Sequence, residues 1–307
     1  MRTKHKYILL APSENIANPC LFEYWRPLLN EQVTIISSKY ICELLKPLLN
    51  IDSLVLRAHH NYIGSANRDY LSHDIFKTWG DKGELLKLTP QHILRGREAL
   101  HRLGIPEDAW FVCFHTREKA DGYVHPAYTK EAEDNYNHRS TFALADIEDY
   151  IPAMNEVVRR GGWCIRMGHP STKPLPVLKN VIDYAHSSEK SDWMDVYLCA
   201  SCKFFVGANS GLASLPSIFG VPTIRANMAP LQDILSKYHR DIWIPKIAVE
   251  ASTNKKVRFI DMLNSSLSKC YNADDFLIAG IKLLNNTPDE IKDLVIEALE
   301  RDNSTSY

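Results

Sequence analysis

The chain lacks long apolar segments, an excess of positive charge and the common phosphate-binding motifs. No apolar run approaches the ~18 residues of a transmembrane helix. Lys and Arg number 36 against 37 Asp and Glu, so no basic surplus favours nucleic-acid binding. The motifs G-x-x-x-x-G-K-[ST], G-x-G-x-x-G and G-x-S-x-G are absent. Their absence argues against a P-loop kinase, a dehydrogenase with the usual fingerprint and an α/β-hydrolase.

Cysteine usage favours a reducing compartment and no metal site. The seven cysteines are an odd number, and most lie within apolar segments, which is typical of buried thiols in the cytosol. Cys199 and Cys202 form one C-x-x-C pair, but no second pair follows at zinc-ligand spacing. We therefore predict a cytoplasmic protein without a metal ion or other cofactor, and we leave open a peripheral contact with the inner face of a membrane.

The length of 307 residues suggests two domains, and the pattern places a boundary near residue 105. In the first part, short apolar runs at 7–11, 33–36 and 53–56 predict strands, and helix-like runs lie between them. Alternation of this kind predicts a parallel sheet. The polar stretch 57–83 reads as a long loop over that sheet. Residues 89–103 form a capped helix that closes the predicted domain 1–105.

The second part, residues 106–307, repeats the alternation. Strands are predicted at 110–114, 163–167, 181–184 and 204–206, with helices at about 147–158 and 191–202. A closing helix begins at Thr287-Pro288-Asp289-Glu290, which combines a cap, a proline at the first helical position and a glutamate at the third. The fold class expected for the chain is therefore α/β, with two parallel sheets and a ligand cleft at the carboxyl ends of their strands.

The most informative segment of the chain is 203–227, KFFVGANSGLASLPSIFGVPTIRAN. A strand leads into the small polar turn that contains Asn209, Ser210 and Gly211, a helix-like run follows, and Gly220 precedes the next extended run. The turn would place a hydroxyl and free N–H groups at a helix N-terminus, where an anion is favoured. Alternatively, Ser210 is only a helix cap, as helices commonly need.

Two other strand ends carry polar groups at the corresponding place. His115-Thr116-Arg117-Glu118 follows the first strand of the second part, and Arg166 to Lys173 follows the second. If these strands are neighbours, Arg117, Arg166 and Lys173 converge on the turn and suit a diphosphate. Each arginine alone has a plainer interpretation as a surface ion pair. Further candidates for donor contact are Gly168, His169, His186 and Ser187, although the histidines and serines can equally be structural.

With these residues in view, the second part resembles the nucleotide-binding domain of GT-B-type glycosyltransferases. The closer resemblance is to bacterial glycosyltransferases linked to surface-glycan synthesis, and it rests on FHTRE (114–118), ADIEDYIPAM (145–154), RRGGWCIRMGHPSTKPLP (159–176), FGVPTI (219–224) and above all the stretch 181–212. It covers the C-terminal part well and the first hundred residues poorly.

The resemblance implies two Rossmann-like domains, an acceptor-facing one at 1–105 and a donor-binding one at 106–307. It implies metal-independent transfer from a nucleotide sugar to a glycan, lipid-linked or protein acceptor. The HTR at 115–117 is similar to the H-x-R stretch of fucosyltransferase-like enzymes, whose arginine holds the donor diphosphate, a role that passes to Arg117. The GHP at 168–170 is similar to a stretch in enzymes that use CMP-sugars, but Met167 replaces their usual lysine. The nucleotide is therefore open among GDP, UDP and CMP.

For the catalytic base we predict Glu118, which follows Arg117 into the cleft, with Asp121 next in rank and Glu14, His59 and His60 as alternatives from the first domain. Glu118 has a competing interpretation as the ion-pair partner of an arginine. At the level of function, two other classes stay open. One is a sugar-nucleotide epimerase or hydrolase on the same scaffold, and the other is a non-catalytic protein that binds nucleotide or glycan.

Overall fold

The computed structural model describes residues 7–10, 18–29, 33–42, 44, 84–118, 130–231 and 240–304. The strand expected at 53–56, the loop 57–83 and the base candidates Glu14, His59, His60 and Asp121 lie outside these residues. The chain forms two compact units. Unit 1 comprises 1–82 and 125–129, and unit 2 comprises 83–124 and 130–307.

Unit 1 contains a parallel β-α-β arrangement. Strands β1 (Tyr7–Leu10) and β2 (Val33–Ile36) pair in parallel, with Tyr7 opposite Val33. Helix α1 (Leu21–Leu29) lies between them in the sequence. These elements are the strands and the first helix that the alternation of apolar runs predicts.

Unit 2 is built on a six-stranded, entirely parallel sheet in the order β5-β4-β3-β6-β7-β8. The strands are β3 (Phe111–His115), β4 (Trp163–Arg166), β5 (Val181–Asp183), β6 (Phe205–Gly207), β7 (Thr223–Met228) and β8 (Ile242–Pro245). The central strands are buried on both faces, which explains their continuous apolar runs. The predicted α/β class with parallel sheets is confirmed.

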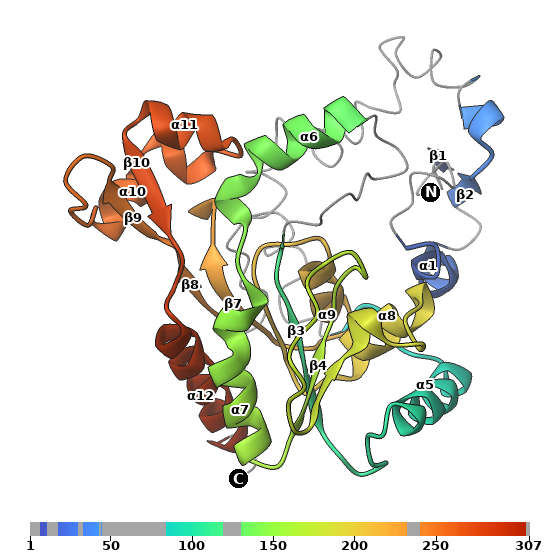
Figure 1. Ribbon diagram of the computed structural model, residues 1–307. Helices are drawn as coiled ribbons and strands as arrows, with labels where there is room; N and C mark the ends of the chain where they lie inside the picture. Colours follow the sequence, from blue (N-terminus) through green and yellow to red (C-terminus); the bar gives the residue numbers. More distant parts are fainter. Residues whose placement is uncertain are drawn as a thin grey trace. The chain divides into compact units, whose positions relative to one another are not determined.

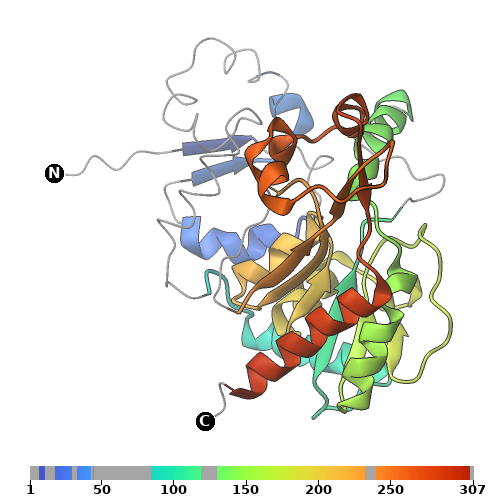
Figure 2. The same cartoon turned by 90° about the vertical axis from the view of Figure 1, so that its left-hand side faces the viewer.

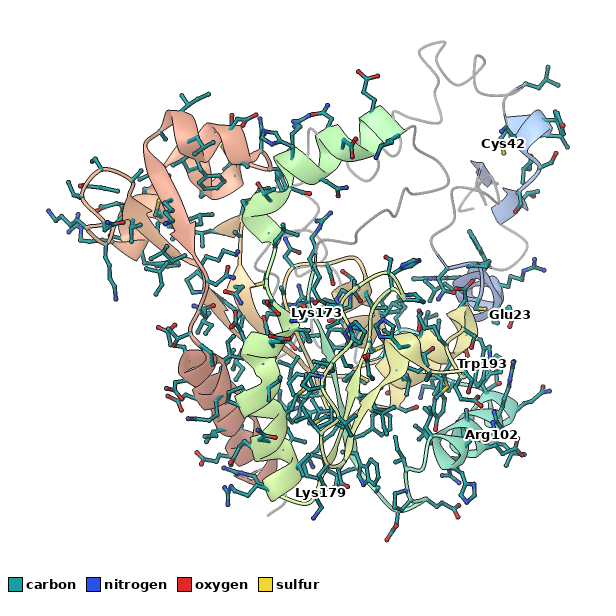
Figure 3. The ribbon with its side chains drawn as sticks, in the orientation of Figure 1. Glu23, Cys42, Arg102, Lys173, Lys179 and Trp193 are labelled. Carbon is teal, nitrogen blue, oxygen red and sulfur yellow. The ribbon has the colours of Figure 1, made fainter. Side chains whose placement is uncertain are left out.

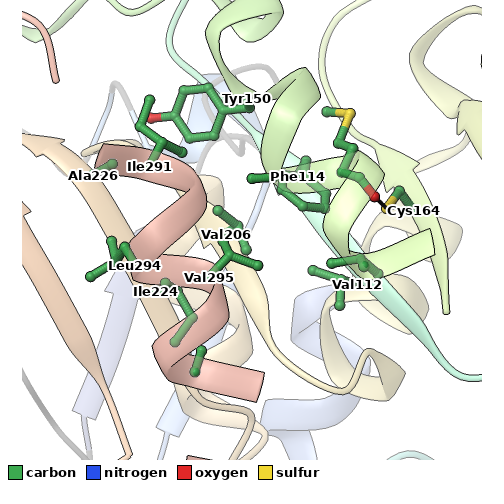
Figure 4. Packing of buried hydrophobic residues seen from close by; sticks show 14 of the residues in the cluster. Val112, Phe114, Tyr150, Cys164, Val206, Ile224, Ala226, Ile291, Leu294 and Val295 are labelled. Carbon is green, nitrogen blue, oxygen red and sulfur yellow. Dashed lines mark hydrogen bonds between the residues drawn. The ribbon is translucent and has the colours of Figure 1, made fainter. Parts of the chain in front are cut away.

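One face of this sheet is covered by two long helices that lie side by side, α7 (Ile151–Arg159) and α12 (Pro288–Ser304) (Figures 1 and 2). Val112 and Phe114 of β3 point into the core that these helices close, and Ile291 and Val295 of α12 pack in the same cluster (Figure 4). Their burial removes large apolar side chains from water, each worth about 1.5–3 kcal/mol. This core therefore fixes the sheet that carries the polar strand ends.

Helices α8 (Asp192–Ser201) and α5 (Pro90–Arg102) pack on each other. The Sγ of Cys113 on β3 donates to the backbone oxygen of Leu198, so α8 covers the sheet face opposite α7. Figure 3 labels Arg102 of α5 and Trp193 of α8 in this layer. The Arg95 guanidinium carbon lies 3.7 Å from the ring centre of Trp193, and Arg102 Nε lies 2.7 Å from Glu189 Oε1. Helix α5 thus belongs to unit 2, whereas the sequence analysis placed it before the domain boundary.

The helix ends show which cap signals hold. Before α12, Thr287 N donates to Glu290 Oε2 at 2.8 Å and Glu290 N donates to Thr287 Oγ1 at 3.2 Å, so the predicted capping box is confirmed. Helix α7 begins at Ile151 after a single 3-10 turn (Ile147–Tyr150), with its proline in the first turn. Ser191 precedes α8, but its hydroxyl donates to the Glu189 carbonyl and does not cap the helix.

A smaller lobe follows β8 in the sequence, and no feature of the sequence analysis predicted it. Strands β9 (Ile247–Glu250) and β10 (Ile281–Leu284) form an antiparallel pair. Helices α10 (Phe259–Asn264) and α11 (Ala273–Ile278) and a 3-10 turn (Ser266–Lys269) connect them, and α6 (Lys130–Arg139) contacts α11. Among the described helices, none is long and apolar enough to cross a bilayer.

Candidate functional site

The strand order of unit 2 creates one topological switch point. The chain runs outward from the central strand β3 to β4 and β5, returns to β6 beside β3, and continues outward to β7 and β8. The connections that leave β3 and β6 therefore diverge in opposite directions. In open α/β sheets, ligands bind at the carboxyl ends of the two strands that flank such a point. The stretches HTRE at 115–118 and ANSG at 208–211 leave the sheet at this place.

Close backbone contact joins these two stretches. His115 is opposite Gly207 in the register, and Ala208 N donates to the His115 carbonyl at 3.3 Å. A Cβ on Gly207 would lie 2.5 Å from that carbonyl oxygen, so only glycine allows this approach. As a result, the Ser210 Oγ lies 3.1 Å from His115 Nδ1 and also accepts from Ala213 N at 3.3 Å.

The His115 ring is neutral in this environment. Burial, together with the positive charges of Arg166, Lys190 and Arg117, lowers the pKa of His115 to about 4. At neutral pH the imidazole therefore offers one N–H donor and one acceptor. Beside it, Thr116 is buried, and its Oγ1 has no hydrogen-bond partner among the described residues. The switch point thus combines hydrogen-bonding groups with the positive charge of Arg117, which acts on the His115 ring.

The helix predicted after the Ser210 turn is shorter than expected. A 3-10 turn (Leu212–Ser214) is followed by α9 (Leu215–Ile218), which is a single α-helical turn. Only a long array of aligned peptide dipoles gives a strong positive helix end, so the dipole contribution here is small. Asn209 turns away from the helix and donates through Nδ2 to the Ala229 carbonyl at 3.3 Å. Gly211 is the residue that precedes the 3-10 turn.

Arg166 lies beneath the strand ends and does not face a ligand. Its side chain has 0% exposure. It donates to Glu118 Oε2 at 2.7 Å, to Asp183 Oδ1 at 3.1 Å and to Thr172 Oγ1 at 2.6 Å. The expectation that Arg166 points into the ligand space is inconsistent with this burial. The reason is the parallel register, which places Arg166 directly opposite Asp183 on the neighbouring strand.

Glu118, the first choice for catalytic base, is the partner of that buried arginine. Burial raises the pKa of the Glu118 carboxyl, and the positive charge of Arg166 acts in the opposite sense. In the described arrangement the carboxylate therefore follows its alternative interpretation as one half of an ion pair. Asp121, the second base candidate, lies outside the described residues.

The loop after β4 is held by further polar contacts. His186 Nδ1 lies 2.9 Å from Asp183 Oδ2, and its Nε2 lies 3.1 and 3.0 Å from the carbonyl oxygens of Pro170 and Thr172. His169 accepts from the N–H of Ser171 within a local turn. These contacts give His186 and His169 defined structural functions.

The other residues of this region that were predicted to contact the nucleotide-sugar donor lie close by. Ser187 donates to the Tyr184 carbonyl at 2.9 Å. A Cβ on Gly168 would lie 3.5 Å from the Arg166 guanidinium carbon, so Gly168 borders the buried cluster. Lys173 is largely exposed, and its Nζ pairs with Glu148 Oε1. Lys173 and Lys179 both belong to the connection between β4 and β5, and Figure 3 shows them at opposite ends of the sheet.

The structure thus separates the predicted residues into two groups. Arg117, Asn209, Ser210 and Gly211 flank the switch point, whereas Arg166, Glu118, Gly168, His169, His186, Ser187 and Lys173 belong to the β4 side. Sequence reasoning missed Asp183 and Thr172. One signal could have indicated the ion pair of Arg166 and Asp183. Asp183 is the last residue of one apolar strand, and Arg166 is the last residue of another.

No group of three or more His, Cys, Asp or Glu side chains is placed to hold a metal ion in the part of the chain that the structure describes. The described cysteines are free thiols. Burial raises the pKa of Cys113 and Cys199 well above the usual thiol value, so these thiols stay protonated at neutral pH.

No protein-family model matches the chain, and no curated protein matches it. A solved structure of a glycosyl transferase family 9 protein from Veillonella parvula DSM 2008 is similar to it, with 12% identity and a TM-score of 0.37 over 69% of this chain. The match covers 53% of that protein, so the chain spans about half the length of this structural neighbour.

Proposed function

We propose that the chain is a glycosyltransferase that moves a sugar from a nucleotide-sugar donor to a hydroxyl of a glycan, lipid-linked or protein acceptor, in surface-polysaccharide or glycoconjugate synthesis. One observation carries the proposal. The HTR stretch, which resembles the H-x-R of fucosyltransferase-like enzymes, leaves the sheet at its switch point and contacts the Ser210 turn. A resemblance in sequence and the general position of ligands in α/β sheets therefore agree on one place.

In this proposal the donor diphosphate lies between the ends of β3 and β6. Arg117 provides a charged, forked donor that suits phosphate oxygens. The neutral His115, the hydroxyl of Ser210 and the N–H groups of residues 209–211 add uncharged hydrogen bonds. These groups act where negative charge grows as the sugar leaves the phosphate, so they stabilise the transition state more than the ground state. The proposed transfer uses no metal ion.

The β4 side has a supporting function in this account. Arg166 binds Glu118, the residue that follows Arg117, and so fixes the backbone that presents Arg117. We propose that Glu118 acts through this ion pair in the described arrangement. Experiment decides whether the catalytic base is Glu118, Asp121 or one of the N-terminal candidates. A base must lie within hydrogen-bond reach of the acceptor hydroxyl and be deprotonated.

The test has a binding arm and a turnover arm. Thermal unfolding with millimolar UDP, GDP and CMP should show stabilisation by one of them, because a ligand that binds only the folded state raises its stability.

Nucleotide sugars carrying that base are then incubated with and without acceptor hydroxyls, and the products are analysed. Transfer to acceptor supports the proposal. An altered sugar nucleotide or hydrolysis without transfer indicates the epimerase or hydrolase class, and binding without turnover indicates a binding protein. Stabilisation by none of the three nucleotides would overturn the donor site.

The substitution Glu118→Gln distinguishes two functions of Glu118, as the catalytic base or as the ion-pair partner of Arg166. If Glu118 is the base, the transfer rate falls by about 10²-fold or more while nucleotide affinity is kept. If it acts through Arg166, the unfolding midpoint and nucleotide affinity change together. His101→Gln, at an exposed position on α5, is the matched control for loss of an ionisable group.

A further inference from the structure

The lobe that follows β8 encloses a cavity of about 170 Å³. Residues from the ends of β7 and β8, from β9 and β10, and from α10 and α11 line it. This is close to the size of engineered apolar cavities of about 150 Å³ that take up benzene-sized molecules. The lobe therefore has space for a small apolar group.

The wall of this cavity is apolar apart from two lysines. The described lining residues are Met228, Ala229, Pro230, Leu231, Pro245, Lys246, Ile247, Ala248, Lys256, Val257, Phe259, Met262, Leu267, Phe276 and Leu283. No carboxylate is among them. An empty apolar space of this size weakens packing, because the lining side chains lose contacts on one side.

Lys246 is the buried one of these two lysines. It is only 7% exposed, and its Nζ donates to the Leu144 carbonyl and to Asn285 Oδ1, both at 2.6 Å. An ammonium group has three N–H donors, so one remains after these two bonds within the described residues. Both acceptors are neutral. A buried cation is usually paired with an anion, and an anionic ligand would supply the missing charge.

The cavity reaches the surface near α10. Phe259 lines it and is 46% exposed, and Lys256 also lines it from an exposed position. Ala248 and Met228, in contrast, are buried. Lys256 and Phe259 therefore mark the exposed side of the cavity, and Lys246 belongs to its buried side.

We propose that this cavity binds a carboxylate with a short unbranched alkyl chain, the carboxylate on the Lys246 ammonium and the chain against Ala248, Met262 and Phe276. The carboxylate offers two acceptor oxygens to the remaining N–H of Lys246, and the chain fills the apolar space. This site is separate from the proposed donor site at β3 and β6, so either can be disproved without the other.

The first experiment uses the unmodified chain. Isothermal titration with butanoate, hexanoate and octanoate should show affinity rising about fourfold for each added CH₂, since each buried CH₂ adds a constant free energy of transfer. Octanol, with the same chain and no charge, should bind at least about tenfold more weakly than octanoate. Affinity that does not depend on chain length, or equal affinity for octanol and octanoate, would overturn the proposal.

Two substitutions locate the site. Lys246→Met keeps an unbranched side chain that is one atom shorter and removes the charge, and it should abolish the preference for octanoate over octanol. Lys255→Met, at an exposed lysine outside the lining, should leave that preference unchanged. Ala248→Leu should fill the cavity and reduce octanoate binding at least tenfold. If Lys246→Met does not fold, the titrations of the unmodified chain and of Ala248→Leu still test the proposal. Octanoate binding that survives Ala248→Leu would place the ligand elsewhere and overturn the proposal.

Discussion

Two neighbouring regions at one sheet edge use polar residues in opposite ways. At the end of β4, the Arg166 guanidinium has no exposure and pairs with the carboxylates of Glu118 and Asp183, although its Nε has no hydrogen-bond partner among the described residues. At the ends of β3 and β6, the contact is a neutral hydrogen bond between His115 and Ser210, and a buried Thr116 hydroxyl has no partner among the described residues. The first region holds loops in place, and the second has hydrogen-bonding capacity for a ligand.

The difference shows that a strand-end position alone does not make a residue a ligand contact. Arg166 ends β4 and Arg117 follows β3 in the same sheet, and sequence reasoning gave them the same function. The register opposes Arg166 to Asp183, which commits its charge to the protein. The substitutions below test this contrast, in order of decreasing expected effect.

Arg166→Met should give the largest loss of stability, about 3–5 kcal/mol, because it leaves two partly buried carboxylates without their partner. Urea unfolding at pH 7 measures it. Adding Glu118→Gln and Asp183→Asn should recover part of the loss by removing the uncompensated charges. A loss below about 1 kcal/mol would show that Arg166 does not hold the β4 side together.

The pH dependence of stability tests the neutral state of His115. Its pKa is about 4 in the folded chain and near 6.5 when unfolded, so the unfolded chain takes up the proton first as the pH falls. The neutral ring contributes up to about 3 kcal/mol to the free energy of unfolding. This contribution is complete above pH 6.5 and is lost as the pH falls to 4. His115→Gln should flatten the unfolding free energy across this window. The control His101→Gln should follow the unmodified chain, and identical slopes for all three would contradict the lowered pKa.

Gly207→Ala tests the close contact between β6 and β3. The added Cβ would lie 2.5 Å from the His115 carbonyl oxygen, and relief of this clash should cost about 1–3 kcal/mol. Gly211→Ala is the matched control, because a Cβ there has no neighbour within 4 Å. Equal unfolding midpoints for both variants would mean that the two strand ends are not held as described.

Lys173→Met should have the smallest effect. Its ammonium pairs with Glu148 at the surface, and exposed pairs add little to stability. We expect no measurable change in the thermal unfolding midpoint or in nucleotide affinity. A clear loss of nucleotide affinity would return Lys173 to the ligand site that the sequence analysis assigned to it.

Local signals in the sequence predicted much of the fold. The capping box at Thr287 and Glu290 and the apolar runs of β3, β4 and β6 depend on neighbours within a few residues. The polar turn at Ser210 was also placed correctly after a strand. For such features, spacing along the chain is sufficient.

Other features depend on contacts between distant residues. The pairing of Arg166 with Asp183 requires the strand register, and the packing of α5 on α8 requires Gly96 to lie against Tyr197, 101 residues away. The lobe after β8 uses strands of four residues and helices of six, which are too short to give a clear period. Its cavity and the burial of Lys246 follow from that packing.

Isothermal titration of the preferred nucleoside diphosphate into the unmodified chain, Arg117→Ala and Lys173→Met tests the central claim most directly. We predict that Arg117→Ala weakens binding by about 10- to 100-fold, since a charge-assisted contact to phosphate is worth roughly 1.5–3 kcal/mol, and that Lys173→Met leaves it unchanged. Equal affinities for the unmodified chain and Arg117→Ala, both folded, would contradict a donor diphosphate site at the ends of β3 and β6.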